Sequence, residues 1–137
     1  MVEKPALSNE ETRASRTYVV CSAGRVVGYF LLASGGVASA KAPGRVRRNM
    51  PDPLPVMIVG RLAVDQSCQG RNIGPSLLRD AVLRTLQAAK IGGIRAILVH
   101  AISEEAKRFY ERYGLAVSPV DPMTLMITVA DAKKALS

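Results

Sequence analysis

The sequence is poor in the residues that form metal sites and disulfide frameworks. Its 137 residues include one histidine, His100, and two cysteines, Cys21 and Cys68. Because the cysteines have neither metal-ligand spacing nor a second pair, we expect reduced thiols and no metal site. A catalytic cysteine would need His100 as its base, and a buried packing role for both thiols is the better interpretation.

Long apolar runs are also missing. No run has the length of a bilayer crossing. The first residues, MVEKPALSNEET, carry acids and a proline where a signal peptide needs an apolar core. We therefore expect a cytoplasmic protein with no membrane partner.

Acidic residues are scarce as well. Asp and Glu number 11 against 19 Lys and Arg, which gives a net charge of +8. No acid occurs within residues 12–51, a stretch that contains Lys41, Arg45, Arg47 and Arg48. A loop with this charge attracts polyanions, although a solvated loop that keeps the protein soluble explains it equally well.

The pattern of apolar residues predicts an α/β (α+β) protein. We expect one domain over 1–137, with a short N-terminal segment over 1–14 and a core over 15–137. β-branched and aromatic runs predict a hairpin over 17–21 and 26–33, a loop over 34–55 with a short strand near Val37, and a central strand over 56–65. Further strands are predicted over 94–101, 115–118 and 123–129.

Two segments have the spacing of amphipathic helices. One begins at Pro75 and ends at the glycine pair 92–93, and the other spans 103–114 with Ser103 as its N-cap and Gly114 at its end. The order strand, helix, strand around the first of these predicts a parallel pair joined by a right-handed crossover.

A glycine-rich segment, CQGRNIGPSLL over 68–78, joins the central strand to the first helix. Pro75 suits the first helical position, where its missing N–H costs nothing. Gly70 and Gly74 permit close approach, and Asn72 is the best substitute for glycine in a left-handed conformation. The amides of 70–74 and the helix dipole together predict an anion site suited to a pyrophosphate, although many turns before helices are glycine-rich for geometry alone.

The same stretch carries a family resemblance. RLAVDQSCQGRNIGPSLLRDA resembles the acetyl-CoA motif of GNAT-fold N-acetyltransferases, with Asn72 in place of a glycine, and EEAKRFYERYGL is similar to that superfamily's second motif. The resemblance implies the GNAT fold, a mixed twisted sheet of about six to seven strands with a central parallel pair and flanking helices. It also implies acetyl-CoA as cofactor.

Other segments extend the resemblance to a narrower group. SRTYVVC, GRVVGYFLLASG and DPMTLMIT look like the GNAT toxins of bacterial toxin–antitoxin pairs, which acetylate the free amine of aminoacyl-tRNA and block translation. This implies aminoacyl-tRNA as acceptor, a ribbon–helix–helix antitoxin as partner and, as a further expectation, a homodimer. Since fourteen residues precede the SRTYVV strand, we expect the N-terminal helices of such toxins to be shortened or absent.

The resemblance also assigns site residues. Tyr110 stands where the family has its catalytic tyrosine and is expected to protonate the departing thiolate, with core packing as the alternative. The backbone of Leu62, Ala63 and Val64 is expected to pair with the pantetheine arm. The other candidate cofactor contacts are Gln69, Gly70, Arg71, Asn72, Ile73, Gly74, Ser103 and Phe109, although capping explains Ser103 and packing explains Phe109. The candidate acceptor contacts are Arg16, Lys41, Arg45, Arg47 and Arg48.

Two other classes of function stay open at this point. The chain is alternatively a GNAT enzyme for another amine, such as a protein lysine or a small metabolite, or a catalytically silent module that binds acyl-CoA or nucleic acid. A protein base is dispensable for an aminoacyl ester, because α-amines titrate near ~7.7–8.0 and ester amines at or below that range. Because His100 stands at a strand end among apolar residues, we interpret it as a satisfied core histidine and not as a base.

Overall fold

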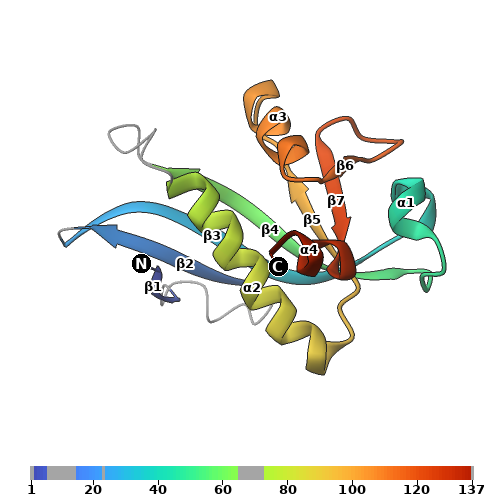
Figure 1. Cartoon of the computed structure of the whole chain (residues 1–137), viewed down its shortest axis with the longest axis horizontal. Coiled ribbons are helices and arrows are strands. Elements are labelled where there is room, and N and C mark those ends of the chain that lie inside the picture. The colour runs from blue at the N-terminus through green and yellow to red at the C-terminus, as the bar shows by residue number, and fades with distance from the viewer. Residues whose placement is uncertain (1, 6–14, 23, 65–72, 137) are drawn as a thin grey trace.

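A computed structural model describes residues 2–5, 15–22, 24–64 and 73–136 of the chain. These residues form a seven-stranded mixed sheet in the order β1-β2-β3-β4-β5-β7-β6, with helices packed on it (Figure 1). The strands are β1 (Val2–Pro5), β2 (Ser15–Ser22), β3 (Arg25–Val37), β4 (Leu54–Val64), β5 (Ala96–His100), β6 (Ala116–Val117) and β7 (Thr124–Thr128). The helices are α1 (Gly44–Arg47), α2 (Ile73–Gly92), α3 (Glu104–Arg112) and α4 (Val129–Leu136), and a 3₁₀ turn, η2, spans Ser39–Lys41.

The predicted hairpin is confirmed, but its second strand is longer than expected. β2 and β3 pair antiparallel, and β3 continues through Gly35 and Gly36, which pair with Val56 and Pro55 of β4. The prediction of a loop from residue 34 was therefore wrong. The small residues are poor in strand propensity, yet the cross-strand ladder satisfies their backbone groups and keeps them extended.

The predicted parallel pair is also confirmed, and it is short. β4 and β5 pair only from Val56 with Ala96 to Val59 with Val99. Beyond Val59, β4 runs on to Val64, and its register with β3 shifts between the pairs Leu31–Gly60 and Tyr29–Ala63. This places one extra residue on β4, a β-bulge, and bulges bend a strand. The ends of β4 and β5 consequently diverge (Figure 1).

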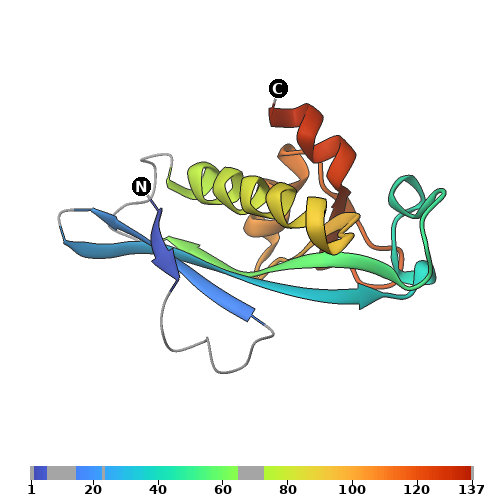
Figure 2. The ribbon, with the colours of Figure 1, turned by 90° about the horizontal axis from the view of Figure 1, so that it is seen from below.

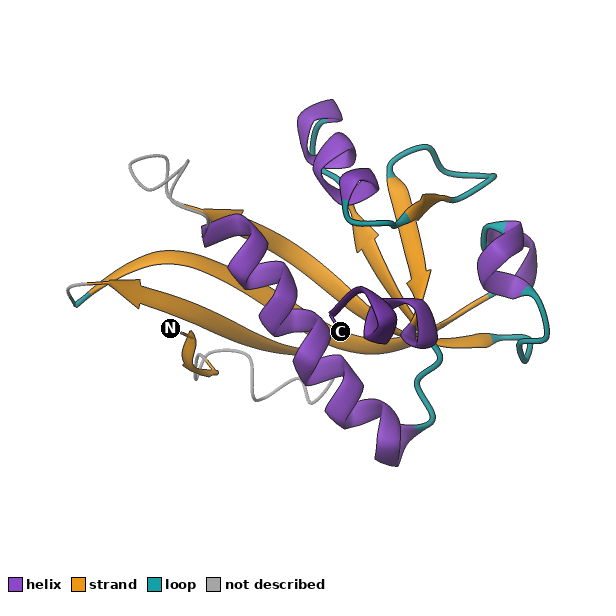
Figure 3. Cartoon of the chain, in the orientation of Figure 1, coloured by secondary structure: helices purple, strands orange, loops and turns teal. Residues whose placement is uncertain are grey.

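One face of the sheet carries the main core. α2 and α4 lie on the same side of β3 and β4 (Figure 2), and Leu77, Leu78 and Ala81 of α2 are buried against that face. Figure 3 shows α2 crossing the long strands while α3 stands beside β5 and β7. α2 buries one stripe at helical spacing, which is why the sequence pattern predicted this helix correctly.

The opposite face carries a smaller core under the segment that joins β3 to β4. Ala42 and Val46 are buried there against Leu54, Val56 and neighbouring side chains. Alternation along β5 separates the two cores, because Ile97 and Val99 belong to the main core while Ala96 and Leu98 belong to the smaller one. The predicted loop over 34–55 thus contains η2 and α1, which cover this face.

The ends of the helices differ in part from the predictions. α2 begins at Ile73, so Pro75 is its third residue and not its first. Proline is tolerated at this position too, because the N–H groups of the first turn have no partner within the helix. Gly93 has a φ of +74°, which agrees with its predicted role in ending α2. Strand β1 and helix α4 were not predicted. β1 is only four residues long, and α4 follows β7 directly with no turn residue between them.

α3 has both of its predicted ends. The Ser103 hydroxyl accepts a hydrogen bond from the Ala106 amide at 3.1 Å. At the other end, Leu115 N–H bonds to Tyr110 C=O and Gly114 N–H to Glu111 C=O, which is a Schellman motif with Gly114 at φ +94°. Among the described helices, none is both long and apolar enough to cross a membrane.

Candidate functional site

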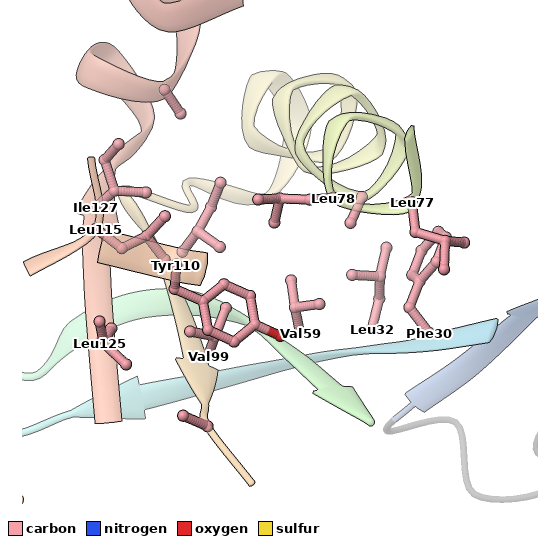
Figure 4. Packing of buried hydrophobic residues seen from close by; sticks show 14 of the residues in the cluster. Phe30, Leu32, Val59, Leu77, Leu78, Val99, Tyr110, Leu115, Leu125 and Ile127 are labelled. Carbon is pink, nitrogen blue, oxygen red and sulfur yellow. The ribbon is translucent and has the colours of Figure 1, made fainter. Parts of the chain in front are cut away.

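Tyr110 lies at the point where β4 and β5 separate. Its side chain is 4% exposed and belongs to the main core with Val59 and Val99, the last residues that pair across the two strands. Figure 4 shows its ring between these valines, with the hydroxyl oxygen pointing toward Val59. The Schellman motif fixes this position, because Leu115 and Tyr110 share both a backbone hydrogen bond and the same core.

Burial also sets the charge state of this phenol. Desolvation raises the pKa of Tyr110 from 10.0 to about 12, so the hydroxyl keeps its proton at neutral pH. In this state the phenol carries a proton that it can donate, and it cannot serve as a base at neutral pH. The core-packing alternative and the proton-donor role are compatible here, since the ring packs while the oxygen points toward the diverging strands.

The candidate cofactor contacts fall into two groups. Leu62, Ala63 and Val64 lie on the part of β4 that has left β5, so the edge of β4 that faces away from β3 is not paired with β5 there. This is the arrangement that an extended ligand needs to add itself as a strand. Ile73 and Gly74 are the first two residues of α2, whose first turn carries no acid. Gln69, Gly70, Arg71 and Asn72 lie outside the described residues.

Ser103 and Phe109 have structural partners. Ser103 caps α3, and Phe109 is half-buried, with its ring at 5.4 Å from that of Tyr110 and 5.1 Å from that of Tyr113. Tyr113 is 41% exposed and lines a groove of about 290 Å³ with Pro75, Ser76 and other residues of α2, β7 and α4. Packing thus accounts for Phe109, and a cofactor contact by either residue stays a prediction.

The basic cluster is an exposed surface. Lys41, Arg45, Arg47 and Arg48 are all exposed on η2, α1 and the residue that follows α1. We call this stretch, residues 39–48, the basic segment. Arg45 lies 3.9 Å from Asp131, and an ion pair of that length between exposed groups leaves the arginine available to other anions.

Arg16 is not part of this surface. It is exposed on β2, paired with Leu32, whereas the basic segment begins after β3 ends at Val37. Five residues of strand separate the two places, roughly 16 Å at the rise of a β-strand. The structure therefore groups four of the five candidate acceptor contacts and leaves Arg16 apart.

The prediction of a core histidine was wrong. His100 is exposed, and its Nδ1 lies 3.0 Å from the hydroxyl of Thr124. The apolar residues before His100 are the buried part of β5, and His100 is the exposed last residue of that strand. The apolar sequence around it therefore led to the wrong prediction. Among the described residues, no group of His, Cys, Asp and Glu side chains could hold a metal ion.

Comparison with known proteins places these features in a family. The model of the acetyltransferase (GNAT) domain matches residues 13–114. The chain belongs to the GNAT acetyltransferases. It is thus an acetyl-CoA-dependent N-acetyltransferase with the GNAT fold, as the sequence motifs predicted.

Two kinds of relative are close in sequence or structure. A protein of Mycobacterium tuberculosis (strain ATCC 25618 / H37Rv) named tRNA-acetylating toxin is 54% identical over 132 residues, which cover 96% of this chain and 80% of the relative. AtaT complexed with acetyl-methionyl-tRNAfMet superposes with a TM-score of 0.83 at 25% identity, over 93% of this chain and 79% of that one. A mutant AtaT toxin bound to the C-terminus of the antitoxin AtaR superposes with a TM-score of 0.75 at 25% identity, over 90% and 72%.

The first prediction concerns Tyr110. Tyr110→Phe keeps the buried ring and removes the proton, so we expect turnover to fall by ~10²–10⁴ while acetyl-CoA affinity is nearly unchanged. Tyr113→Phe is the matched control, because Tyr113 is the exposed C-cap residue of the same helix and loss of its hydroxyl should leave turnover at the wild-type value. Steady-state kinetics together with calorimetry measure both quantities. Full activity of Tyr110→Phe would return the residue to a purely structural role.

The second prediction concerns the start of α2. Gly74→Glu places a carboxylate where we expect the pyrophosphate, so acetyl-CoA binding should be lost in calorimetry. Acids in the first turn stabilise a helix, so the melting temperature should not fall and a loss of binding reports on the ligand. Gly74→Ala adds no charge and is the control. Wild-type affinity in Gly74→Glu would contradict the assignment of this turn to the cofactor.

Proposed function

We propose that this chain transfers the acetyl group of acetyl-CoA to the free α-amine of aminoacyl-tRNA and thereby acts as a toxin that blocks translation. The observation that carries the proposal is the exposed basic segment, which covers the smaller core on one face of the sheet, while Tyr110 lies in the main core of the other face where β4 and β5 separate. A polyanionic acceptor and a thioester donor then approach from different sides. The relative from Mycobacterium tuberculosis, named for tRNA acetylation, supports the same acceptor.

The proposed roles follow from the geometry. Bound acetyl-CoA supplies the thioester. Leu62, Ala63 and Val64 offer the backbone edge that does not pair with β5 to an extended arm, and the amides at the start of α2 face the phosphates. Tyr110 holds a proton at neutral pH and gives it to the sulfur that leaves. The basic segment grips phosphates of the acceptor and reads no bases.

Further partners are part of the proposal. The AtaT structure with the C-terminus of AtaR supports an antitoxin that covers the basic segment or the entrance to Tyr110. We propose a ribbon–helix–helix protein for this role, a homodimer for the toxin itself and the cytoplasm as the location, since aminoacyl-tRNA is found there. Co-purification from the native operon tests the antitoxin, and harmless expression of the chain alone would count against a toxin.

Mass spectrometry of aminoacyl-tRNA tests the reaction directly. After incubation with the protein and acetyl-CoA, we expect an N-acetylated aminoacyl group on the tRNA. A set of free lysine peptides and small amines is the comparison. Acetylation of one of these, with unmodified aminoacyl-tRNA, would favour a GNAT enzyme for another amine.

The salt dependence tests the basic segment. Each phosphate contact with a single-stranded acceptor end contributes ~0.7 to the slope of log affinity against log salt. Arg47→Ala with Arg48→Ala should weaken acetylation of aminoacyl-tRNA and flatten this slope, yet leave acetyl-CoA binding and acetylation of a minimal aminoacyl ester intact. Lys90→Ala with Arg95→Ala removes the same charge from exposed positions at and after the end of α2 and is the control.

An equal loss of acetylation of aminoacyl-tRNA and of the minimal ester in the double mutant would contradict the assignment of the basic segment to the acceptor. In that case the basic segment supports the fold or the cofactor, because the minimal ester carries no phosphate for the arginines to hold.

A further inference from the structure

A hydrogen-bonded chain ends at His100 on the side of the sheet that faces the proposed acceptor. The Thr124 hydroxyl donates to Asp121 Oδ2 at 2.8 Å, and the Met123 amide donates to Asp121 Oδ1 at 3.0 Å. His100 Nδ1 lies 3.0 Å from the same Thr124 hydroxyl. The chain Asp121–Thr124–His100 therefore joins the turn before β7 to the end of β5.

The direction of these bonds fixes the tautomer of His100. A hydroxyl has one proton, and Thr124 gives it to Asp121, so the Thr124 oxygen must accept from His100. The amide of Met123 and the hydroxyl of Thr124 lower the pKa of Asp121 below its usual value, which keeps this carboxylate ionised and the order of donors fixed. Nδ1 thus carries the proton, and Nε2 is left with its lone pair.

The position of His100 relates it to the reaction. It follows Val99, the last β5 residue that pairs with β4 and a neighbour of Tyr110 in the main core. By alternation along β5, its side chain leaves on the opposite face, where the basic segment lies. The Ser118 hydroxyl, in the turn that carries Asp121, donates to the carbonyl of Lys41 at 2.6 Å and ties that turn to the basic segment.

We propose that His100 Nε2 receives the proton of the acceptor amine, with Thr124 and Asp121 as the residues that orient the ring. As the amine nitrogen bonds to the thioester carbonyl carbon and the carbon–sulfur bond breaks, the amine proton passes to Nε2 and the thiolate takes the proton of Tyr110. Water then exchanges protons with both residues. The inference rests on the proposed function, because it takes the acceptor from the side of the basic segment.

Other ionisable groups near His100 do not replace it. Glu104 and Glu105 follow it in the first turn of α3, where the helix dipole stabilises their charge, and Asp121 is already engaged by Thr124 and Met123. His100 is exposed, and its Nε2 carries the lone pair that can accept a proton.

Single-turnover kinetics of two variants test the proposal. His100→Asn keeps a donor that reaches Thr124 and lacks Nε2, and His100→Ala removes the ring. We expect the rate of acetylation to fall about 10²-fold in both variants. This is the lower end of the range for general base catalysis, because part of the amine is already neutral. Acetyl-CoA affinity and melting temperature should stay at wild-type values. Added imidazole should restore activity to His100→Ala, and the pH–rate profile of both variants should differ from that of wild type.

The controls separate this role from a structural one. Thr124→Val leaves Nε2 in place but frees the ring, so we expect a smaller loss with the wild-type pH profile. A rate within twofold of wild type in His100→Asn, or a loss that imidazole does not restore and that follows a lower melting temperature, would overturn the proposal.

Two acceptors are used so that the proposal for His100 and the proposed function can fail separately. Each measurement is made with aminoacyl-tRNA and with an amino acid ethyl ester. If wild type acetylates only the ester, the tRNA acceptor is contradicted while the His100 comparison is decided on the ester. Acetylation of neither acceptor would count against both proposals.

Discussion

The separation of β4 from β5 is the constraint on which the rest of the structure depends. Four residues on each strand pair in parallel, and the bulge near Gly60 then turns β4 away. In a fully paired sheet, β5 would occupy this whole edge of β4. Because the strands diverge beyond Val59 and Val99, the last part of β4 does not pair with β5, which is the arrangement that strand addition by an extended ligand needs.

The two faces around this point have different chemistry. The main core side is apolar and holds Tyr110, whose burial raises its pKa and keeps its proton in place at neutral pH. The other side carries the small core, the exposed basic segment and His100. The hydrogen bond from Ser118 to Lys41 makes the basic segment and the turn before β7 one unit. The proposed contacts with a polyanion and the hydrogen bonds that hold the His100 ring thus involve the same short part of the chain.

Local patterns in the sequence predicted the regular elements better than the loops. The stripe of α2, the caps of α3 and the glycine at position 114 each act within a few residues, so they are visible in the sequence and were found. The extension of β3 through Gly35 and Gly36 depends on pairing with a distant strand, and propensity alone could not reveal it. His100 was misassigned for the same reason, since its partners Thr124 and Asp121 lie more than twenty residues away.

Burial raises the pKa of Tyr110, and this value has to be compared with the pKa of the thiol whose thiolate it would protonate. With a pKa of about 12, Tyr110 is a weaker acid than an ordinary thiol, near ~8.5, so transfer of its proton to a solvated thiolate would be uphill. A thiolate formed beside Tyr110 would lie against the buried side chains of the main core, where it would also be desolvated. Desolvation raises the pKa of both groups, which brings them closer together and makes the transfer feasible.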